Sequence, residues 1–208
     1  MGTYCETILI YGAFKDAWRK CNVIDLLEVS KRILIDCLGA KAEEKYLVIT
    51  DDFEEELADY LYEAGKELKL ISMLLKIPPL TKSGEEPPLT AAEAMKNADI
   101  VICITRGSLT HTKAKEEAVK AGARIATMPG ITKDMFLEGA ITADYTEVEN
   151  LTKRVAEILT QGERVVIKKG RYDLEMSIKG RKGIESTGRY LEKGQSGNLP
   201  SGEAYIAP

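Results

Sequence analysis

Short apolar runs alternate with amphipathic segments over the first three quarters of the sequence, and this alternation leaves few possible folds. We expect strands at residues 46–50, 68–76, 100–105 and 124–128, and helices at 16–38, 54–67, 90–96, 109–121 and 147–161. Strands separated by helices of about 10–15 residues form a parallel sheet through right-handed crossovers. Strands without polar alternation are typical of a sheet covered on both faces. The sequence therefore predicts an α/β fold, with a Rossmann-like parallel sheet and helices on both faces.

The pattern changes after Gly162. Residues 164–168 form one apolar strand, and residues 172–179 then alternate apolar and charged side chains with the period of a half-exposed antiparallel strand. A glycine-rich stretch follows. We predict an α/β domain at 1–161 and the start of a second, β-rich domain at 162–208. Because 47 residues are too few to close a core, we expect this second domain to be incomplete, in a fragment or a chain completed by another.

Composition excludes several classes of function. A formal charge of -4 provides no field for nucleic acid or an anionic membrane. The single histidine, His111, excludes His-pair metal motifs within the chain. The four cysteines form no C-x-x-C pair, and Cys103 lies in an apolar run as a core residue would. Scattered cysteines, no secretory signal and no membrane-length apolar run predict a cytoplasmic protein.

The segment 105–112 is the first candidate for a binding site. It follows the strand at 100–105, and the carboxyl ends of parallel strands commonly hold ligands. Arg106 could bind a carboxylate, with Ser108, Thr110 and His111 beside it at a helix N-terminus. The alternative interpretation is that Ser108 or Thr110 caps the helix and His111 lies in its first turn.

Dinucleotide binding is disfavoured by the turn after residues 46–50. No G-x-G-x-x-G stands there, and residues 51–55 read Asp-Asp-Phe-Glu-Glu. Four carboxylates would repel a pyrophosphate. Asp51 or Asp52 is instead suited to capping the helix that follows.

Glu203 is the candidate metal ligand. It stands between Gly202 and an apolar, strand-like segment, where a carboxylate could face a cleft or a metal ion. Residue chemistry alone favours a solvated glutamate in a turn. The surrounding residues 198–208 read Asn-Leu-Pro-Ser-Gly-Glu-Ala-Tyr-Ile-Ala-Pro.

This segment resembles the N-L-P-x-G-E-x-x-x-A-P signature of the aminopeptidase T-like thermophilic leucyl metallo-aminopeptidases. The resemblance implies a dimeric, two-domain hydrolase that acts on peptides and holds zinc, cobalt or a similar divalent metal ion with Glu, His and Asp ligands. Residues 162–208 would be the incomplete start of its β-rich, metal-binding catalytic domain. Glu203 matches the first glutamate ligand, whereas His111 matches none. The remaining ligands would lie beyond Pro208.

The resemblance implies a metal-dependent aminopeptidase that releases N-terminal residues from peptides, truncated and inactive as this chain. Two alternatives stay open. One is a non-heme iron, dihydroxypyridine-type ring-cleaving dioxygenase, which resembles the peptidases in fold; the presence of Glu203 favours the peptidase. The other is a non-catalytic module that binds a small ligand at Arg106–Thr112.

Overall fold

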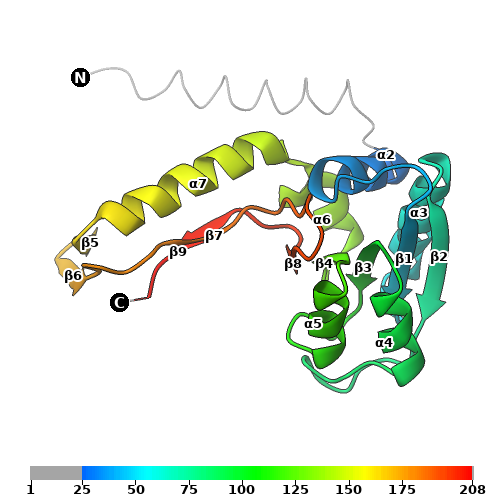
Figure 1. Cartoon of the computed structure of the whole chain (residues 1–208). Coiled ribbons are helices and arrows are strands. Elements are labelled where there is room, and N and C mark those ends of the chain that lie inside the picture. The colour runs from blue at the N-terminus through cyan, green and yellow to red at the C-terminus, as the bar shows by residue number, and fades with distance from the viewer. Residues whose placement is uncertain (1–24, 208) are drawn as a thin grey trace.

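A computed structural model describes residues 25–207 as an α/β body with an elongated arm (Figure 1). The helical segments are α2 Leu26–Arg32, a π-helical turn Ile33–Cys37, α3 Glu55–Glu67, α4 Leu89–Lys96, α5 Lys113–Lys120, α6 Lys133–Glu138, a 3-10 turn Ala140–Thr142 and α7 Tyr145–Gln161. The strands are β1 Lys45–Thr50, β2 Ile71–Lys76, β3 Ile100–Ile104, β4 Arg124–Thr127, β5 Arg164–Lys169, β6 Tyr172–Ser177, β7 Ile184–Ser186, β8 Ser196–Asn198 and β9 Glu203–Tyr205. The predicted α/β class is confirmed. The N-terminal part of the helix expected at 16–38 lies outside the described residues.

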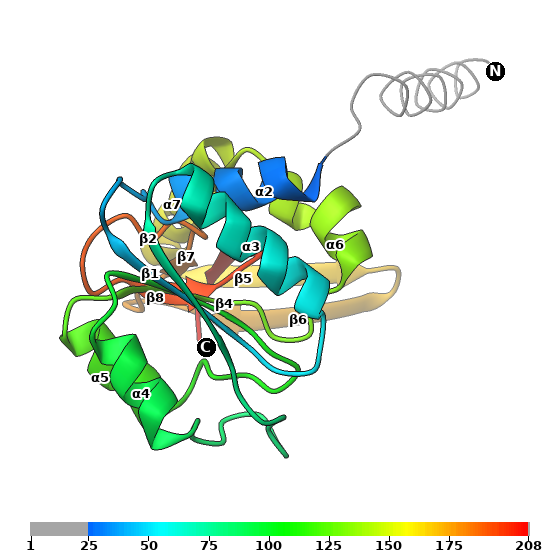
Figure 2. The same ribbon diagram turned by 90° about the vertical axis from the view of Figure 1, so that its right-hand side faces the viewer.

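Five parallel strands form the sheet in the order β2-β1-β3-β4-β8. Alternate residues of its central strands enter two separate cores. Tyr46 and Val48 pack with α2 and α3, whereas Leu47 and Ile49 pack with α4 and α5 on the opposite face. Figure 2 shows α2 and the pair α4 and α5 on opposite sides of the sheet. Burial on both faces explains why these strands show no polar alternation.

The short strand β8 extends this sheet, although it lies late in the chain. Ser196–Asn198 pairs in parallel with β4, next to Ile125–Thr127. The division at residue 161 stays a prediction, but residues on both sides of it share one sheet.

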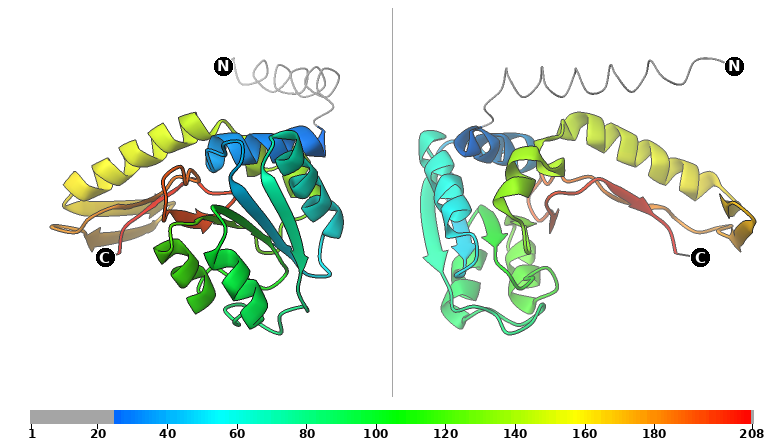
Figure 3. Two further views of the ribbon diagram at one scale, coloured as in Figure 1. Left: turned by 45° about the vertical axis from the view of Figure 1, so that its right-hand side comes forward. Right: turned by 180° about the vertical axis from the view of Figure 1, so that it is seen from behind.

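The arm comprises α7, the hairpin β5–β6 and the antiparallel pair β7–β9 (Figure 3). Helix α7 leads away from the body to the hairpin, and the chain returns along the helix. One hairpin face pairs Ile167 with Leu174, which are 53% and 56% exposed. None of the helices described between residues 25 and 207 is long and apolar enough to cross a membrane.

A buried ion pair ties the start of β4 to the loop before β1. Arg124 is 4% exposed and its Nη2 lies 2.6 Å from Oε2 of Glu44. Its Nη1 donates to the carbonyl oxygens of Leu38 and Gly39 at 2.6 and 2.9 Å. The guanidinium therefore closes the end of the π-helical turn against the sheet.

We predict that Arg124→Ala lowers the free energy of unfolding by about 3 kcal/mol, because it leaves buried acceptors and a half-buried carboxylate without their partner. Arg164→Ala is the matched control, since the Arg164–Glu175 pair is exposed and should contribute less than about 1 kcal/mol. Urea denaturation followed by circular dichroism measures both. Equal effects of the two substitutions would contradict this role.

Asp51 joins the carboxyl ends of β1 and β3. Its side chain is buried at 1% exposure; Oδ1 accepts from the Phe53 amide at 2.9 Å and Oδ2 from the Arg106 amide at 3.0 Å. The expectation that Asp51 or Asp52 caps the following helix is wrong. Glu54 occupies the N-cap position of α3 with no side-chain cap bond, and the Asp51 carboxylate is committed to the loop between strands.

We predict that Asp51→Asn destabilises the fold by about 1–3 kcal/mol, because an amide has one acceptor oxygen for two backbone donors. Asp52→Asn is the control: Asp52 is exposed and pairs with Lys76 on the surface, so its loss should cost under about 1 kcal/mol. Thermal unfolding of the two variants under identical conditions provides the comparison. A smaller shift for Asp51→Asn than for Asp52→Asn would refute the assignment.

Candidate functional site

The carboxyl edge of the sheet contains the position at which α/β proteins commonly bind a ligand. Strand β2 lies on one side of β1 and β3 on the other, so the order in which strands are added to the sheet switches sides between β1 and β3. Open α/β sheets bind ligands at such a point. Here the buried Asp51 carboxylate bridges the two strand ends, and each of its oxygens accepts from a backbone amide.

The loop at 78–88 covers the end of β3. The Gly84 amide donates to the Ser108 carbonyl at 2.8 Å, and the Ser108 amide donates to Ser83 Oγ at 3.2 Å. A Cβ at Gly107 would lie 2.9 Å from Leu80 Cβ, so the close approach requires glycine. This loop therefore packs against the predicted binding segment at 105–112.

Helix α5 begins later than the sequence suggests, at Lys113 rather than near residue 109. Thr112 caps it by accepting from the Lys115 amide at 3.2 Å, so the expectation of a cap at Ser108 or Thr110 is wrong. The Glu86 carboxylate accepts from the amides of Lys113 and Ala114 at 2.7 and 3.1 Å. An anionic ligand at this helix N-terminus would have to displace Glu86.

Four polar side chains form a cluster at the ends of β3, β4 and β8, which we call the strand-end cluster. Thr110 Oγ1 lies 2.9 Å from Thr127 Oγ1 and donates to Asn198 Oδ1 at 2.9 Å. Thr127 Oγ1 is 2.7 Å from the same Oδ1, and Ser108 Oγ donates to Thr110 Oγ1 at 2.7 Å. These hydroxyl and amide groups carry no charge, so the cluster suits positioning or neutral hydrogen bonding rather than proton transfer.

The predicted substrate-binding residues separate into two pairs. Ser108 and Thr110 belong to the strand-end cluster. Arg106 is exposed and its guanidinium lies over the Phe53 ring at 5.0 Å from the centroid, while His111 is exposed in the turn before α5. Substrate binding by these four residues stays a prediction.

The segment 198–203 is anchored firmly to the sheet at its beginning. The Leu199 amide donates to the Thr127 carbonyl at 2.9 Å, and the Tyr190 hydroxyl donates to the Asn198 carbonyl at 2.8 Å. A Cβ at Gly197 would lie 2.3 Å from Tyr190 Oη, so glycine is needed there. Burial raises the pKa of Tyr190, and the nearby Glu203 charge acts in the same direction. Tyr190 therefore stays a neutral donor at physiological pH.

Glu203 is the first residue of β9, opposite Ser186 of β7, and its side chain is exposed. A shallow apolar groove of about 300 Å³ lies between α7 and β9, where Gly202 and Ala204 face Val148 and Leu151. The Glu203 side chain does not line this groove, although its neighbours Gly202 and Ala204 do, and its carboxylate is open to solvent.

A complete metal site does not follow from these residues. Within residues 25–207, no group of three or more His, Cys, Asp and Glu side chains is arranged to hold a metal ion. A catalytic divalent ion typically has about three protein ligands. The described donors therefore do not fit a resident metal by themselves, and Glu203 could supply one ligand.

Sequence reasoning did not assign roles to Glu86 or Thr127, nor to Asn198 beyond its place in the motif. Thr127 and Asn198 each lie at a strand end. The position of Thr127 could have been predicted, because residues 124–128 have the pattern of a strand. Glu86 lies 27 residues before the amide of Lys113 that it caps. No pattern in the local sequence predicts a contact between residues so far apart.

No protein-family model and no curated protein sequence matches this chain. The solved structures that resemble it include two that match over 88% of its length. One is 2,5-dihydroxypyridine dioxygenase from Pseudomonas putida KT2440, at 18% identity and a TM-score of 0.69 over 55% of that chain. The other is wild-type AmpT (aminopeptidase T) from Thermus thermophilus, at 13% identity and a TM-score of 0.59 over 61% of that chain.

Identities this low establish a shared fold and no shared activity. The chain spans between 55% and 61% of the length of these two proteins. It is therefore similar in fold to part of an aminopeptidase and to part of a dioxygenase.

Proposed function

We propose that this chain contributes the α/β body and one metal ligand to a metal-dependent aminopeptidase that releases N-terminal residues from peptides. The observation that carries the proposal is Glu203, exposed at the start of β9 in a segment anchored by Asn198 and Tyr190. The fold likeness to AmpT supports the same function.

Glu203 would bind one divalent ion, such as zinc or cobalt, together with ligands from protein outside residues 25–207. The apolar groove could receive the side chain of a peptide substrate, since its walls include Val148 and Leu151. Partners in this proposal are the peptide and a second copy of the chain, and the cytoplasm is the compartment.

The full-length product of the gene is the material for the test. We predict metal-dependent release of p-nitroaniline from Leu-p-nitroanilide, reduced at least about 100-fold by Glu203→Gln, because a neutral amide is a poor ligand for a divalent cation. Glu185→Gln is the matched control, since Glu185 is exposed on β7 opposite Ala204. The 208-residue chain alone should show no hydrolysis.

Two outcomes would overturn the proposal. Metal-dependent turnover that survives Glu203→Gln would remove Glu203 from the ligand set. Hydrolysis by the 208-residue chain alone would show that residues 1–208 suffice for activity.

Ring-cleaving dioxygenation is the second candidate, favoured by the higher TM-score of the Pseudomonas putida structure. The same full-length protein, supplied with Fe(II), would then consume oxygen with 2,5-dihydroxypyridine and release no p-nitroaniline. Oxygen consumption measured alongside the peptidase assay separates the two activities.

A further inference from the structure

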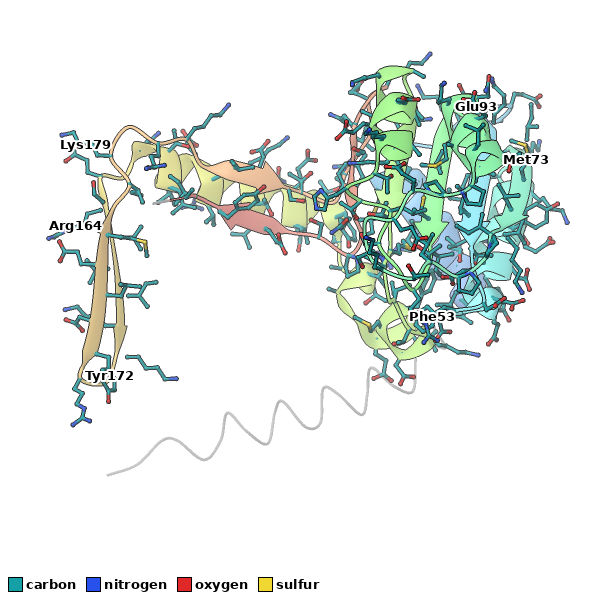
Figure 4. All side chains as sticks on the ribbon, turned by 90° about the horizontal axis from the view of Figure 1, so that it is seen from below. Phe53, Met73, Glu93, Arg164, Tyr172 and Lys179 are labelled. Carbon is teal, nitrogen blue, oxygen red and sulfur yellow. The ribbon has the colours of Figure 1, made fainter. Side chains whose placement is uncertain are left out.

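The outer edge of the sheet is formed by β2, which is long, apolar and paired on one side only. Its neighbour is β1, and no other described strand lies beyond it. Figure 4 shows Met73 at the outer rim of the body. Ile71, Met73 and Leu74 are 51%, 40% and 38% exposed. An exposed apolar edge strand is a template for pairing with another strand.

The ladder to β1 shows which backbone groups are free. The Ile71 amide donates to the backbone carbonyl oxygen of Glu44 at 2.9 Å, and the Ile77 amide donates to that of Thr50 at 2.8 Å. Because parallel strands bond through alternate residues, odd-numbered residues of this strand face β1. Ser72, Leu74 and Lys76 therefore direct their N–H and C=O groups outward.

The strand sequence is symmetric about Leu74. Residues 71–77 read Ile-Ser-Met-Leu-Leu-Lys-Ile. In an antiparallel pair centred on Leu74, Ile71 meets Ile77 of a second copy, Met73 meets Leu75, and Ser72 meets Lys76. Each apolar residue then faces an apolar one, and the two polar positions face each other.

We propose that β2 pairs with β2 of a second copy of this chain across a two-fold axis, joining the two sheets into one continuous sheet. The free backbone groups of Ser72, Leu74 and Lys76 become the hydrogen-bonded positions of this antiparallel ladder. The occupant is a second copy rather than another peptide because the strand is complementary to itself in this register, as a two-fold interface requires.

Lys76 does not prevent this pairing. Its Nζ lies 2.8 Å from carboxylate oxygens of both Asp52 and Glu55 of the same chain. The ammonium groups of two copies are therefore neutralised locally, and each would lie opposite a Ser72 rather than another lysine.

Sedimentation analysis tests the surface with a pair of matched variants. The unmodified chain should be a dimer, and Leu74→Lys should raise its dissociation constant about tenfold or more, because two lysines would face each other at the centre of the ladder. Leu174→Lys, which places the same charge at an exposed leucine of the arm, should leave the dimer intact. Circular dichroism confirms that both variants fold.

A monomeric chain at all concentrations would overturn the proposal. So would a dimer that survives Leu74→Lys, and dissociation by Leu174→Lys would place the interface on the arm instead.

Cross-linking tests the register. With Cys5 and Cys21 replaced by serine, only Cys37 and Cys103 remain; burial raises the pKa of both to about 12, so these thiols stay protonated and unreactive. Leu74→Cys should form a covalent dimer under mild oxidation, because facing residues of a hydrogen-bonded pair have Cα atoms about 5.5 Å apart.

Ile71→Cys is the control for the register. Residue 71 of one copy would lie about 20 Å from residue 71 of the other, six residues away along the ladder. A disulfide through Ile71→Cys with none through Leu74→Cys would contradict the proposed pairing.

Discussion

Strands β1 and β3 bury alternate side chains in two different cores, and the rest of the body is arranged around this double burial. Val48 and Ile102 contribute to the core under α2 and α3, whereas Leu47 and Val101 contribute to the core under α4 and α5. All four are at most 2% exposed. Burying both faces of these strands away from water is the main favourable contribution to the free energy of folding of the body. The connections between strands and helices therefore lie at the two ends of the sheet, where polar groups can still find partners.

At the carboxyl edge of the sheet the chain satisfies its polar groups largely by itself. Asp51 binds two backbone amides, Glu86 caps α5, and the hydroxyls of Thr110 and Thr127 share the Asn198 side chain. The place where many α/β proteins bind a ligand is consequently filled by the protein's own carboxylates and hydroxyls. The strand-end cluster instead connects the sheet to the segment that presents Glu203.

Sequence patterns predicted the body more accurately than the contacts at its edge. Residues 100–105 are expected to form a strand because residues 100–104 are five consecutive apolar residues. Strand β3 occupies 100–104, and all five residues are buried. The helix expected from residue 109 begins at Lys113, since the intervening residues form a turn whose hydroxyls bond to β4 and β8. Strand β8 has no apolar pattern at all; its backbone pairs with β4 because the chain returns to the sheet.

The sequence by itself determined the α/β class, the buried strands and the position of Glu203 in a recognisable segment. The spacing of apolar residues predicts which side chains of a helix or strand are buried, and this spacing is a property of the local sequence. The tertiary structure decided that Asp51 links two strands instead of capping a helix, that Glu86 reaches α5, and that Asn198 is held by Thr110 and Thr127. These contacts join residues distant in sequence, and their energy depends on geometry that exists only after the sheet has formed.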